Sequence, residues 1–201
     1  FIVLISACSS SDKWETKSTQ SPEDEGVKTS YQKRVEHYRD SISAVFCSGM
    51  NKVLPPAAIS TSCRLKYFDV NEKFKVQARF EPIKDGAIFK MKTNTERLPE
   101  YRNFGKLYFE IGGESLVLTL YQNVEQPDYL FCPFKDLTNG KESYGAGRYL
   151  DFRLKDIENP VLDFNYSYNP YCAYNDEYSC PIPPQENHLN IAVLAGEKNW
   201  H

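Results

Sequence analysis

Hydrophobic and polar positions change their spacing along the chain, and each spacing predicts a different kind of element. Between residues 31 and 46, apolar side chains recur mostly every three or four residues, at Tyr31, Val35, Tyr38, Ile42, Val45 and Phe46. This spacing places them on one face of an α-helix. Thr29 or Ser30 can cap the start of this helix, and Ser48-Gly49 is a suitable end.

Beyond a Pro55-Pro56 turn, the hydrophobic spacing becomes two, which is typical of β-strands. We expect about nine short strands, at residues 65–68, 74–80, 87–92, 106–111, 115–121, 129–134, 147–152, 161–165 and 190–194. Gly112-Gly113 between two of them is a strong hairpin signal. The pattern predicts an α+β fold of mainly antiparallel strands, a sandwich or a strongly curved sheet, with one N-terminal helix and a long irregular C-terminal loop.

Two stretches interrupt the alternation, at residues 136–149 and 165–188. The second is rich in Asn, Pro, Tyr and Cys and has no periodicity. Loops longer than about 12 to 15 residues without secondary structure are uncommon and often functional. We therefore expect these two loops to carry the working surface. The glycines of Tyr144-Gly145-Ala146-Gly147-Arg148 lack phosphate-loop spacing, so they favour a tight turn or a close backbone approach.

The first eight residues are apolar and then small, and they end at Cys8. Ile5-Ser6-Ala7-Cys8 resembles the lipobox of bacterial lipoproteins, in which the cysteine is diacylated and becomes the N-terminus. The resemblance implies that residues 1–8 end a signal peptide and that lipid on Cys8 anchors the protein outside the cytoplasm. The alternative is a buried N-terminal strand with an unmodified cysteine. Ser9, where an Asp would retain enteric lipoproteins at the inner membrane, favours the outer membrane.

Composition limits the partners. Residues 9–28 are polar and predict a flexible tether, followed by a single β-rich domain at 29–201. The net charge is −3, and Lys and Arg are scattered, which disfavours nucleic acid as a partner. We expect contact with the membrane through the lipid anchor only, and an unknown ligand or protein partner in the cell envelope. The 14 Tyr residues suit either strands with one wet face or a binding surface.

The other five cysteines are expected to meet an oxidising compartment, where disulfides form. Cys47 and Cys63 bracket the Pro-Pro turn, and Cys172 and Cys180 lie across the irregular loop. We predict the disulfides Cys47–Cys63 and Cys172–Cys180, which leave Cys132 as a buried thiol on a strand.

Two alternatives stay open for Cys172 and Cys180. They can be free structural thiols, or they can form a metal or redox site together with His188. Their wide spacing is unlike the close cysteine pairs of zinc sites. We therefore predict no metal site and no cofactor.

The last third of the chain carries several distinctive motifs. They are Pro133–Gly140, Tyr144–Leu150, Leu162–Asn165, Tyr168–Pro170, Cys172–Tyr174, Cys180-Pro181, Pro183-Pro184, Glu186-Asn187, Leu189 and Ala195–Lys198. These segments resemble the DUF1684 family of bacterial and archaeal proteins, a domain of unknown function. The resemblance spans residues 31–198, implies one domain, and implies no particular reaction, cofactor or partner. Cys132, Ser143 and His188 stand where the family usually has an aliphatic residue, Thr and Arg, and Cys47 and Cys63 are local additions.

The polar residues of these motifs are the candidate ligand-binding residues, together with one tyrosine. They are Arg148, Tyr149, Asp163, Asn165, Glu186 and Asn187. Arg offers a rigid fork for a carboxylate or phosphate, and Asn both donates and accepts hydrogen bonds. An aromatic floor is expected from Tyr144, Tyr149, Tyr168 and Tyr174. The structural alternative is that these side chains satisfy loop backbone groups, for example through an Arg148–Asp163 or Arg148–Glu186 pair.

Three functions follow from these residues. The favoured hypothesis is a lipid-anchored binding module that uses loops 136–149 and 165–188. The second is a hydrolase-like envelope enzyme, with Glu186 as acid or base and with Arg148 and Asn165 orienting the substrate. The third is a scaffold with no site.

Overall fold

The computed structural model describes residues 28–200. The predicted signal segment at residues 1–8, with its lipid anchor, and nearly all of the predicted tether lie outside the described residues. Within the described part, no helix is long and apolar enough to cross a bilayer.

The helix α1 (Ser30–Cys47) confirms the prediction from the hydrophobic spacing. Its start is closed by a capping box: the Thr29 hydroxyl accepts from the Gln32 backbone N–H at 3.1 Å, and the Gln32 side chain accepts from the Thr29 N–H at 2.8 Å. Ser48 caps its other end. The predicted Cys47–Cys63 disulfide is present and ties the end of α1 to the segment that leads into the sheet.

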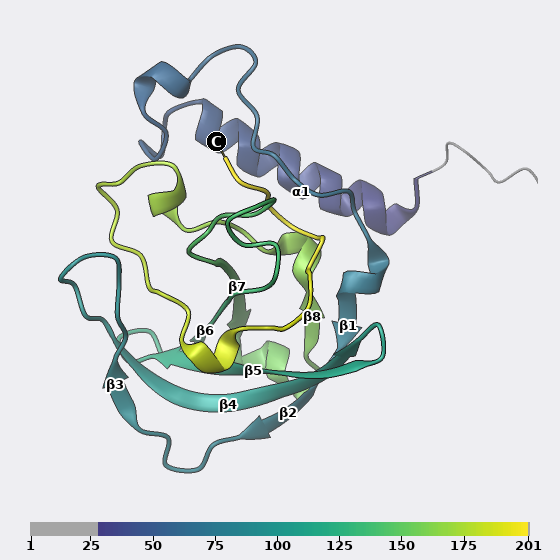
Figure 1. Cartoon of the computed structure of the whole chain (residues 1–201), viewed down its shortest axis with the longest axis vertical. Helices are drawn as coiled ribbons and strands as arrows, with labels where there is room; N and C mark the ends of the chain where they lie inside the picture. Colours follow the sequence, from purple (N-terminus) through teal and green to yellow (C-terminus); the bar gives the residue numbers. More distant parts are fainter. Residues whose placement is uncertain (1–27, 201) are drawn as a thin grey trace, which may run out of the picture.

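Within residues 28–200, eight strands make two antiparallel sheets. They are β1 (Lys75–Gln77), β2 (Arg79–Pro82), β3 (Ile88–Lys90), β4 (Glu100–Ile111), β5 (Glu114–Asn123), β6 (Tyr129–Phe134), β7 (Arg148–Arg153) and β8 (Val161–Asp163). The larger sheet has the order β2-β4-β5-β6-β7, with β3 also paired to β4, and β1 pairs with β8. Figure 1 shows β4 and β5 as long curved ribbons. The α+β class with mainly antiparallel strands is confirmed.

The Gly112-Gly113 pair forms the predicted hairpin between β4 and β5. Both glycines have positive φ, at 61° and 86°, as a two-residue turn between twisted strands requires.

Two predicted strands are wrong. Residues 65–68 form only a single bridge, from Tyr67 to Glu197. Residues 190–194 are irregular because their backbone groups bond elsewhere: Val193 N–H donates to the Asp136 carboxylate at 3.2 Å, and Ile191 O accepts from Leu137 N–H at 2.9 Å. The alternating hydrophobicity of these segments therefore reflects the burial of their apolar side chains. Their backbones do not form the hydrogen-bonded pairing of a β-sheet.

A β-bulge between Asn103 and Gly105 interrupts β4 and changes which way its side chains point. Tyr101, before the bulge, joins a different cluster from Leu107, after it. Gly105 allows the close approach of β2, because a Cβ there would lie 2.3 Å from the Phe80 ring. The extra residue lets β4 contribute to two separate clusters of buried side chains.

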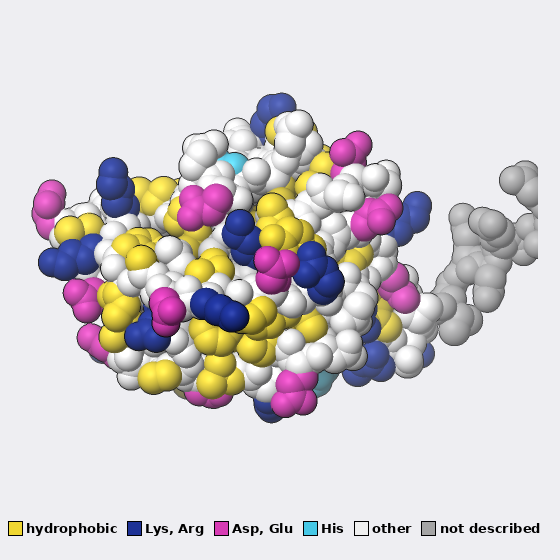
Figure 2. All heavy atoms as spheres, turned by 90° about the horizontal axis from the view of Figure 1, so that it is seen from below, with side chains coloured by type: hydrophobic (Ala, Val, Ile, Leu, Met, Phe, Trp, Pro, Cys, Tyr) yellow, Lys and Arg dark blue, Asp and Glu magenta, His cyan; other side chains and the backbone are white. Residues whose placement is uncertain are grey.

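The elements stack with α1 on one side, the large sheet on the other and the C-terminal third of the chain between them (Figure 1). Tyr31 donates to Asp163 at 2.8 Å, and the Arg39 guanidinium donates to the backbone oxygens of Phe68 and Asn165. On the face shown in Figure 2, basic and acidic side chains are interspersed among apolar ones. Much of the irregular C-terminal part of the chain lies between α1 and the sheet (Figure 1).

Candidate functional site

Strands β6 and β7 separate two clusters of buried side chains. Because side chains alternate along a strand, Leu150 and Phe152 of β7 join the main core while Tyr149 joins a second cluster. On β6, Phe131 belongs to the second cluster, together with Tyr121 of β5. The second cluster is mainly aromatic, and three of its residues, Tyr101, Phe131 and Tyr149, line the cavity described below.

A cavity of about 440 Å³ lies between α1, this aromatic face of the sheet and the C-terminal segment. Eight aromatic rings line it: Tyr38, Phe46, Tyr101, Tyr129, Phe131, Tyr149, Tyr168 and Tyr171. Several of them meet edge to face, and the Phe131 and Tyr149 ring centroids are 4.7 Å apart. Such rings offer a large apolar area with fixed geometry.

Asp151 places a carboxylate in the cavity wall. It lies two residues after Tyr149 on β7, so both side chains point to the same face. It accepts hydrogen bonds from the hydroxyls of Tyr129 at 2.7 Å and Tyr168 at 2.8 Å. Desolvation raises the pKa of Asp151, and the two hydroxyl bonds oppose that rise. At the rim, the exposed Arg97 is held by a bond from its guanidinium to the Ser179 carbonyl at 2.8 Å.

Glu197 is a second carboxylate in the lining, and it is almost fully buried. Its oxygens accept from the Tyr174 hydroxyl and from the Asn169 backbone N–H, the latter at 2.7 Å. Burial raises the pKa of Glu197 to about 7, although these hydrogen bonds and the charge of Arg148 act in the opposite direction. The carboxyl therefore changes charge near neutral pH.

Asn169 carries an unused acceptor. Its side-chain nitrogen donates to the Lys198 carbonyl at 2.8 Å, which defines which end of the amide is oxygen. Its Oδ1 is buried and has no hydrogen-bond partner among the described residues, and the residue is 1% exposed. A buried polar atom without a partner costs about 1–3 kcal/mol. Because Asn169 lines the cavity, a donor on a bound ligand would recover that cost.

Arg148 lies outside this cavity and is completely enclosed. It forms an ion pair with Asp136 at 2.8 Å, and it donates to the carbonyls of Val193, Ala195 and Glu197. The predicted pairing of Arg148 with Asp163 or Glu186 is therefore wrong: its acidic partner is Asp136. Burial lowers the pKa of Arg148, and the Asp136 charge opposes this shift.

The other predicted polar residues also have structural partners. Asp163 accepts from Tyr31, and the enclosed Asn165 bonds to the backbone of Asn71. Asn187, also enclosed, bonds to the backbone N–H and carbonyl of Thr119 and to the backbone carbonyl of Pro133.

Glu186 is exposed and accepts from the Tyr121 hydroxyl at 2.8 Å. It does not line the cavity, and within residues 28–200 no hydrogen bond or ion pair joins it to Arg148 or Asn165. The structure therefore does not bring the predicted enzyme residues together.

Of the six predicted ligand-binding residues, only Tyr149 lines the cavity. Of the other residues of the predicted aromatic floor, Tyr168 lines it too, whereas Tyr144 and Tyr174 pack into the cluster at the end of α1. Loop 165–188 supplies much of the wall, through Tyr168, Asn169, Pro170, Tyr171, Cys180 and Pro181. Loop 136–149 reaches it only at its last residue. Its Gly147 has a φ of +109°, and a Cβ at this position would lie 2.7 Å from the Phe134 carbonyl oxygen, so the sequence prediction of a close backbone approach fits.

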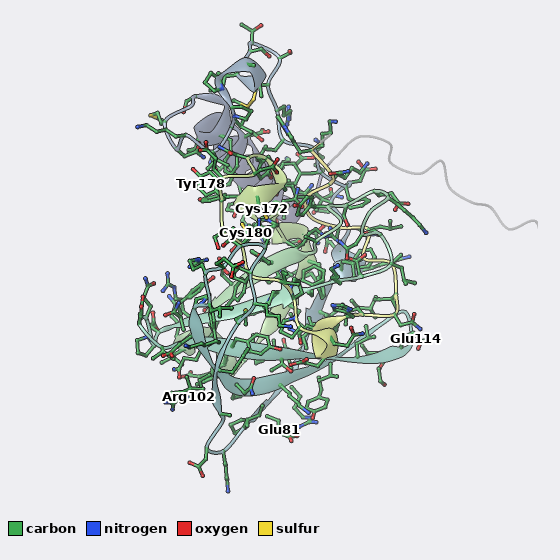
Figure 3. The ribbon with its side chains drawn as sticks, turned by 60° about the vertical axis from the view of Figure 1, so that its left-hand side comes forward. Glu81, Arg102, Glu114, Cys172, Tyr178 and Cys180 are labelled. Carbon is green, nitrogen blue, oxygen red and sulfur yellow. A yellow bond between two sulfur atoms is a disulfide. The ribbon has the colours of Figure 1, made fainter. Side chains whose placement is uncertain are left out.

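Cys172 and Cys180 lie side by side between α1 and the sheet (Figure 3). The structure holds them as thiols, where we had predicted a disulfide. In place of a covalent bond, the Cys180 sulfur accepts from the Cys172 backbone N–H at 3.2 Å. Hydrogen bonding from Cys172 lowers the pKa of the Cys180 thiol. Cys132 is the predicted buried thiol on a strand.

In the described part of the chain, no group of three or more His, Cys, Asp or Glu side chains is arranged to hold a metal ion. The residues that line the cavity bring aromatic rings, the carboxylates of Asp151 and Glu197, the Asn169 amide, the Cys180 thiol and the Arg97 guanidinium.

Sequence reasoning did not select Asp151, Asn169 or Glu197 as site residues. Asn169 and Glu197 do belong to the distinctive motifs Tyr168–Pro170 and Ala195–Lys198. Asp151 could have been found from strand alternation, because it must share a face with Tyr149. The aromatic residues of α1 and β4 carried no signal that distinguished a cavity from a core.

Comparison with known proteins agrees with the family resemblance. The family model described as a protein of unknown function, DUF1684, matches residues 63–198. The solution NMR structure of an uncharacterised protein from Haloarcula marismortui is similar, with a TM-score of 0.65 and 32% sequence identity, over 84% of this chain and 94% of that one. No curated protein matches the chain. The chain belongs to the DUF1684 family.

Proposed function

We propose that this protein is a binding module that takes a small organic ligand into the aromatic cavity between α1 and the sheet. One observation carries the proposal: Asn169, whose buried Oδ1 has no hydrogen-bond partner among the described residues, is one of the residues that line an open cavity. Ligand sites are typically concave, mostly apolar, about 300–1,000 Å³ in volume, and equipped with a few polar groups. The aromatic cavity has all of these properties.

The loop expected to carry the working surface supports the same site. Residues 165–188 wall the cavity without forming a strand, and they are held by bonds to neighbouring segments. Tyr149 and Tyr168 pair through their backbones, with N–H to carbonyl distances of 2.9 and 3.1 Å. The site is thus built on anchored backbone, which suits binding without a large rearrangement.

We further propose that the module works outside the cytoplasm, held at the outer membrane by lipid on Cys8. The Cys47–Cys63 disulfide supports an oxidising compartment. A flexible segment of about twenty residues would span roughly 25 Å between the lipid and the domain. The cavity could then receive a ligand from the surrounding envelope.

Metabolic labelling with an alkynyl fatty acid tests the anchor. The wild-type protein should take up label and sediment with the outer membrane, and Cys8→Ser should lose both properties. Labelling of Cys8→Ser equal to that of the wild type would refute lipidation at this cysteine.

Ligand-observed NMR with a library of small fragments tests the site. Ile42 of α1 lines the cavity, whereas Val45 of the same helix is exposed. Ile42→Trp should fill part of the cavity and abolish the saturation-transfer signals of fragments that bind the wild type. Val45→Trp adds a similar bulk to the outer face of α1 and should keep them.

Thermal unfolding of both variants checks that they remain folded. If no fragment binds the wild type, or if Ile42→Trp retains every fragment, the cavity is not a ligand site.

A further inference from the structure

Two residues that line the aromatic cavity, Asn169 and Asp151, keep capacity to accept hydrogen bonds, while three of its tyrosine hydroxyls already donate within the fold. The hydroxyl protons of Tyr129 and Tyr168 are used on Asp151, and that of Tyr149 is used on the Pro181 carbonyl. Among residues 28–200, no group donates a hydrogen bond to Asn169 Oδ1. A carboxylate oxygen has room for more than one donor, so Asp151 also keeps capacity. A ligand that brings N–H or O–H groups fits this lining.

The charges in the lining point in the same direction. Asp151 and Glu197 are acidic, and Arg97 is the one basic residue among the described lining residues. Arg97 is exposed, and its guanidinium is already bonded to Ser179 through two nitrogens. The cavity therefore has more negative than positive charge once both carboxyl groups are ionised.

Aromatic rings add to this preference, because the face of a ring is negative and attracts cations within about 6 Å of its centre. The protein already uses this attraction outside the cavity: the Lys75 ammonium lies 4.5 Å from the Tyr31 ring centre, and the Arg79 guanidinium 4.4 Å from that of Tyr108. The eight rings of the cavity have no comparable partner inside it, since the Arg153 guanidinium near Tyr129, at 5.7 Å, does not line the cavity.

We infer that the ligand is a protonated organic amine with N–H groups and an apolar or aromatic body. This inference rests on the proposed function and names the class of ligand for the same cavity. The ammonium donates to Asn169 Oδ1, the carboxylate of Asp151 balances its charge, and the tyrosine rings contact its body.

Other ligand classes fit less well. A carboxylate would bring a negative charge and more acceptors next to Asp151 and Glu197. A quaternary ammonium would satisfy the charge and the rings but has no N–H for Asn169. A neutral alcohol would supply a donor without a charge. The amine is the class that uses all three features.

A matched series of probes tests the inference by isothermal titration at pH 7.5. The probes share a phenylethyl body: 2-phenylethylamine, N,N,N-trimethyl-2-phenylethylammonium, 2-phenylethanol and 3-phenylpropanoate. The amine should bind tightest. The alcohol and the quaternary cation should each bind about tenfold more weakly, because each lacks one contribution worth about 1–1.5 kcal/mol. The carboxylate should show no measurable binding.

Asp151→Asn removes the charge and keeps one oxygen, which can accept from one of the two tyrosine hydroxyls, while its NH2 group takes the place of the other oxygen. The variant should lose about tenfold in affinity for the amine and keep the affinity for the alcohol. Glu110→Gln, which removes a carboxylate from an exposed position of β4, is the matched control and should change neither. Unfolding curves show whether Asp151→Asn remains folded, and Ile42→Trp shows whether each probe occupies the cavity.

The outcomes separate the ligand class from the site. If 2-phenylethanol or 3-phenylpropanoate binds as tightly as the amine or more tightly, and Ile42→Trp abolishes that binding, the ligand class is not an amine. The cavity would still be a binding site. If the amine does not bind while other library fragments do, the amine class is also overturned and the cavity remains a binding site. Absence of all binding removes the proposed function itself.

Discussion

Arg148 and Tyr149 are neighbours on β7, yet they belong to two regions with opposite properties. Arg148 points into a closed network in which Asp136 and three backbone carbonyls surround it. Tyr149 points into an open aromatic cavity with an unpartnered acceptor. The difference comes from the alternation of side chains along a strand. It teaches that a polar motif residue is as much a candidate for holding the fold as for holding a ligand.

An unpartnered polar atom has a different meaning in each region. Arg148 Nε also has no partner, but Arg148 is fully enclosed, so no ligand reaches it. Asn169, in contrast, is one of the residues that line the cavity. The position of the residue beside a cavity therefore distinguishes the two unused hydrogen-bonding groups.

The largest expected effect concerns the closed network. Arg148→Ala leaves the Asp136 carboxylate buried without its ion-pair partner and removes donors from three carbonyls. Removing one member of a buried ion pair costs about 3–5 kcal/mol. Urea unfolding monitored by circular dichroism should show a loss of this size.

Arg153→Ala on the same strand is the control, since its ion pair with Asp128 is exposed and spans 3.6 Å. Exposed pairs contribute about 0–1 kcal/mol. If the two variants lost the same amount of unfolding free energy, the enclosed network around Arg148 would contribute no more to stability than an exposed ion pair. The proposed difference between the two regions would then be wrong.

A smaller effect is expected where the two regions meet, at Glu197. Its backbone carbonyl accepts from Arg148, and its carboxylate lines the cavity. The folded pKa of about 7 exceeds the ordinary value of 4.5, so the folded state holds a proton that the unfolded state has lost. Stability from this group is therefore fully present below about pH 4.5 and is lost as the pH rises to about 7, by about 3 kcal/mol in all.

Glu197→Gln should remove this contribution to the pH dependence. The difference in unfolding free energy between the wild type and Glu197→Gln should change between pH 4.5 and 8, with the wild type becoming relatively less stable. Glu110→Gln should run parallel to the wild type over the same range. A pH-independent difference for Glu197→Gln would show that Glu197 has an ordinary pKa and that its side chain meets solvent.

Local patterns predicted the elements whose causes are local. The helix was predictable from its spacing and from Thr29, and the β4–β5 hairpin from Gly112-Gly113, because each depends on neighbouring residues. Residues 65–68 and 190–194 were predicted wrongly as strands because alternation reports burial, and burial arises there from packing against distant segments. The bulge at Asn103 had no signal in the spacing, so the placement of Tyr101 was not predictable.

The sequence by itself determined the fold class, the family motifs, α1, the hairpin and the Cys47–Cys63 disulfide, because these follow from periodicity, turn chemistry and short-range pairing. The tertiary structure alone decided which motif residues face a cavity. Arg148, Asn165 and Asn187 became structural because their partners, such as Asp136 and the Thr119 backbone, come from other elements. Asn169 became the candidate contact because the fold gave its nitrogen a partner and left its oxygen without one.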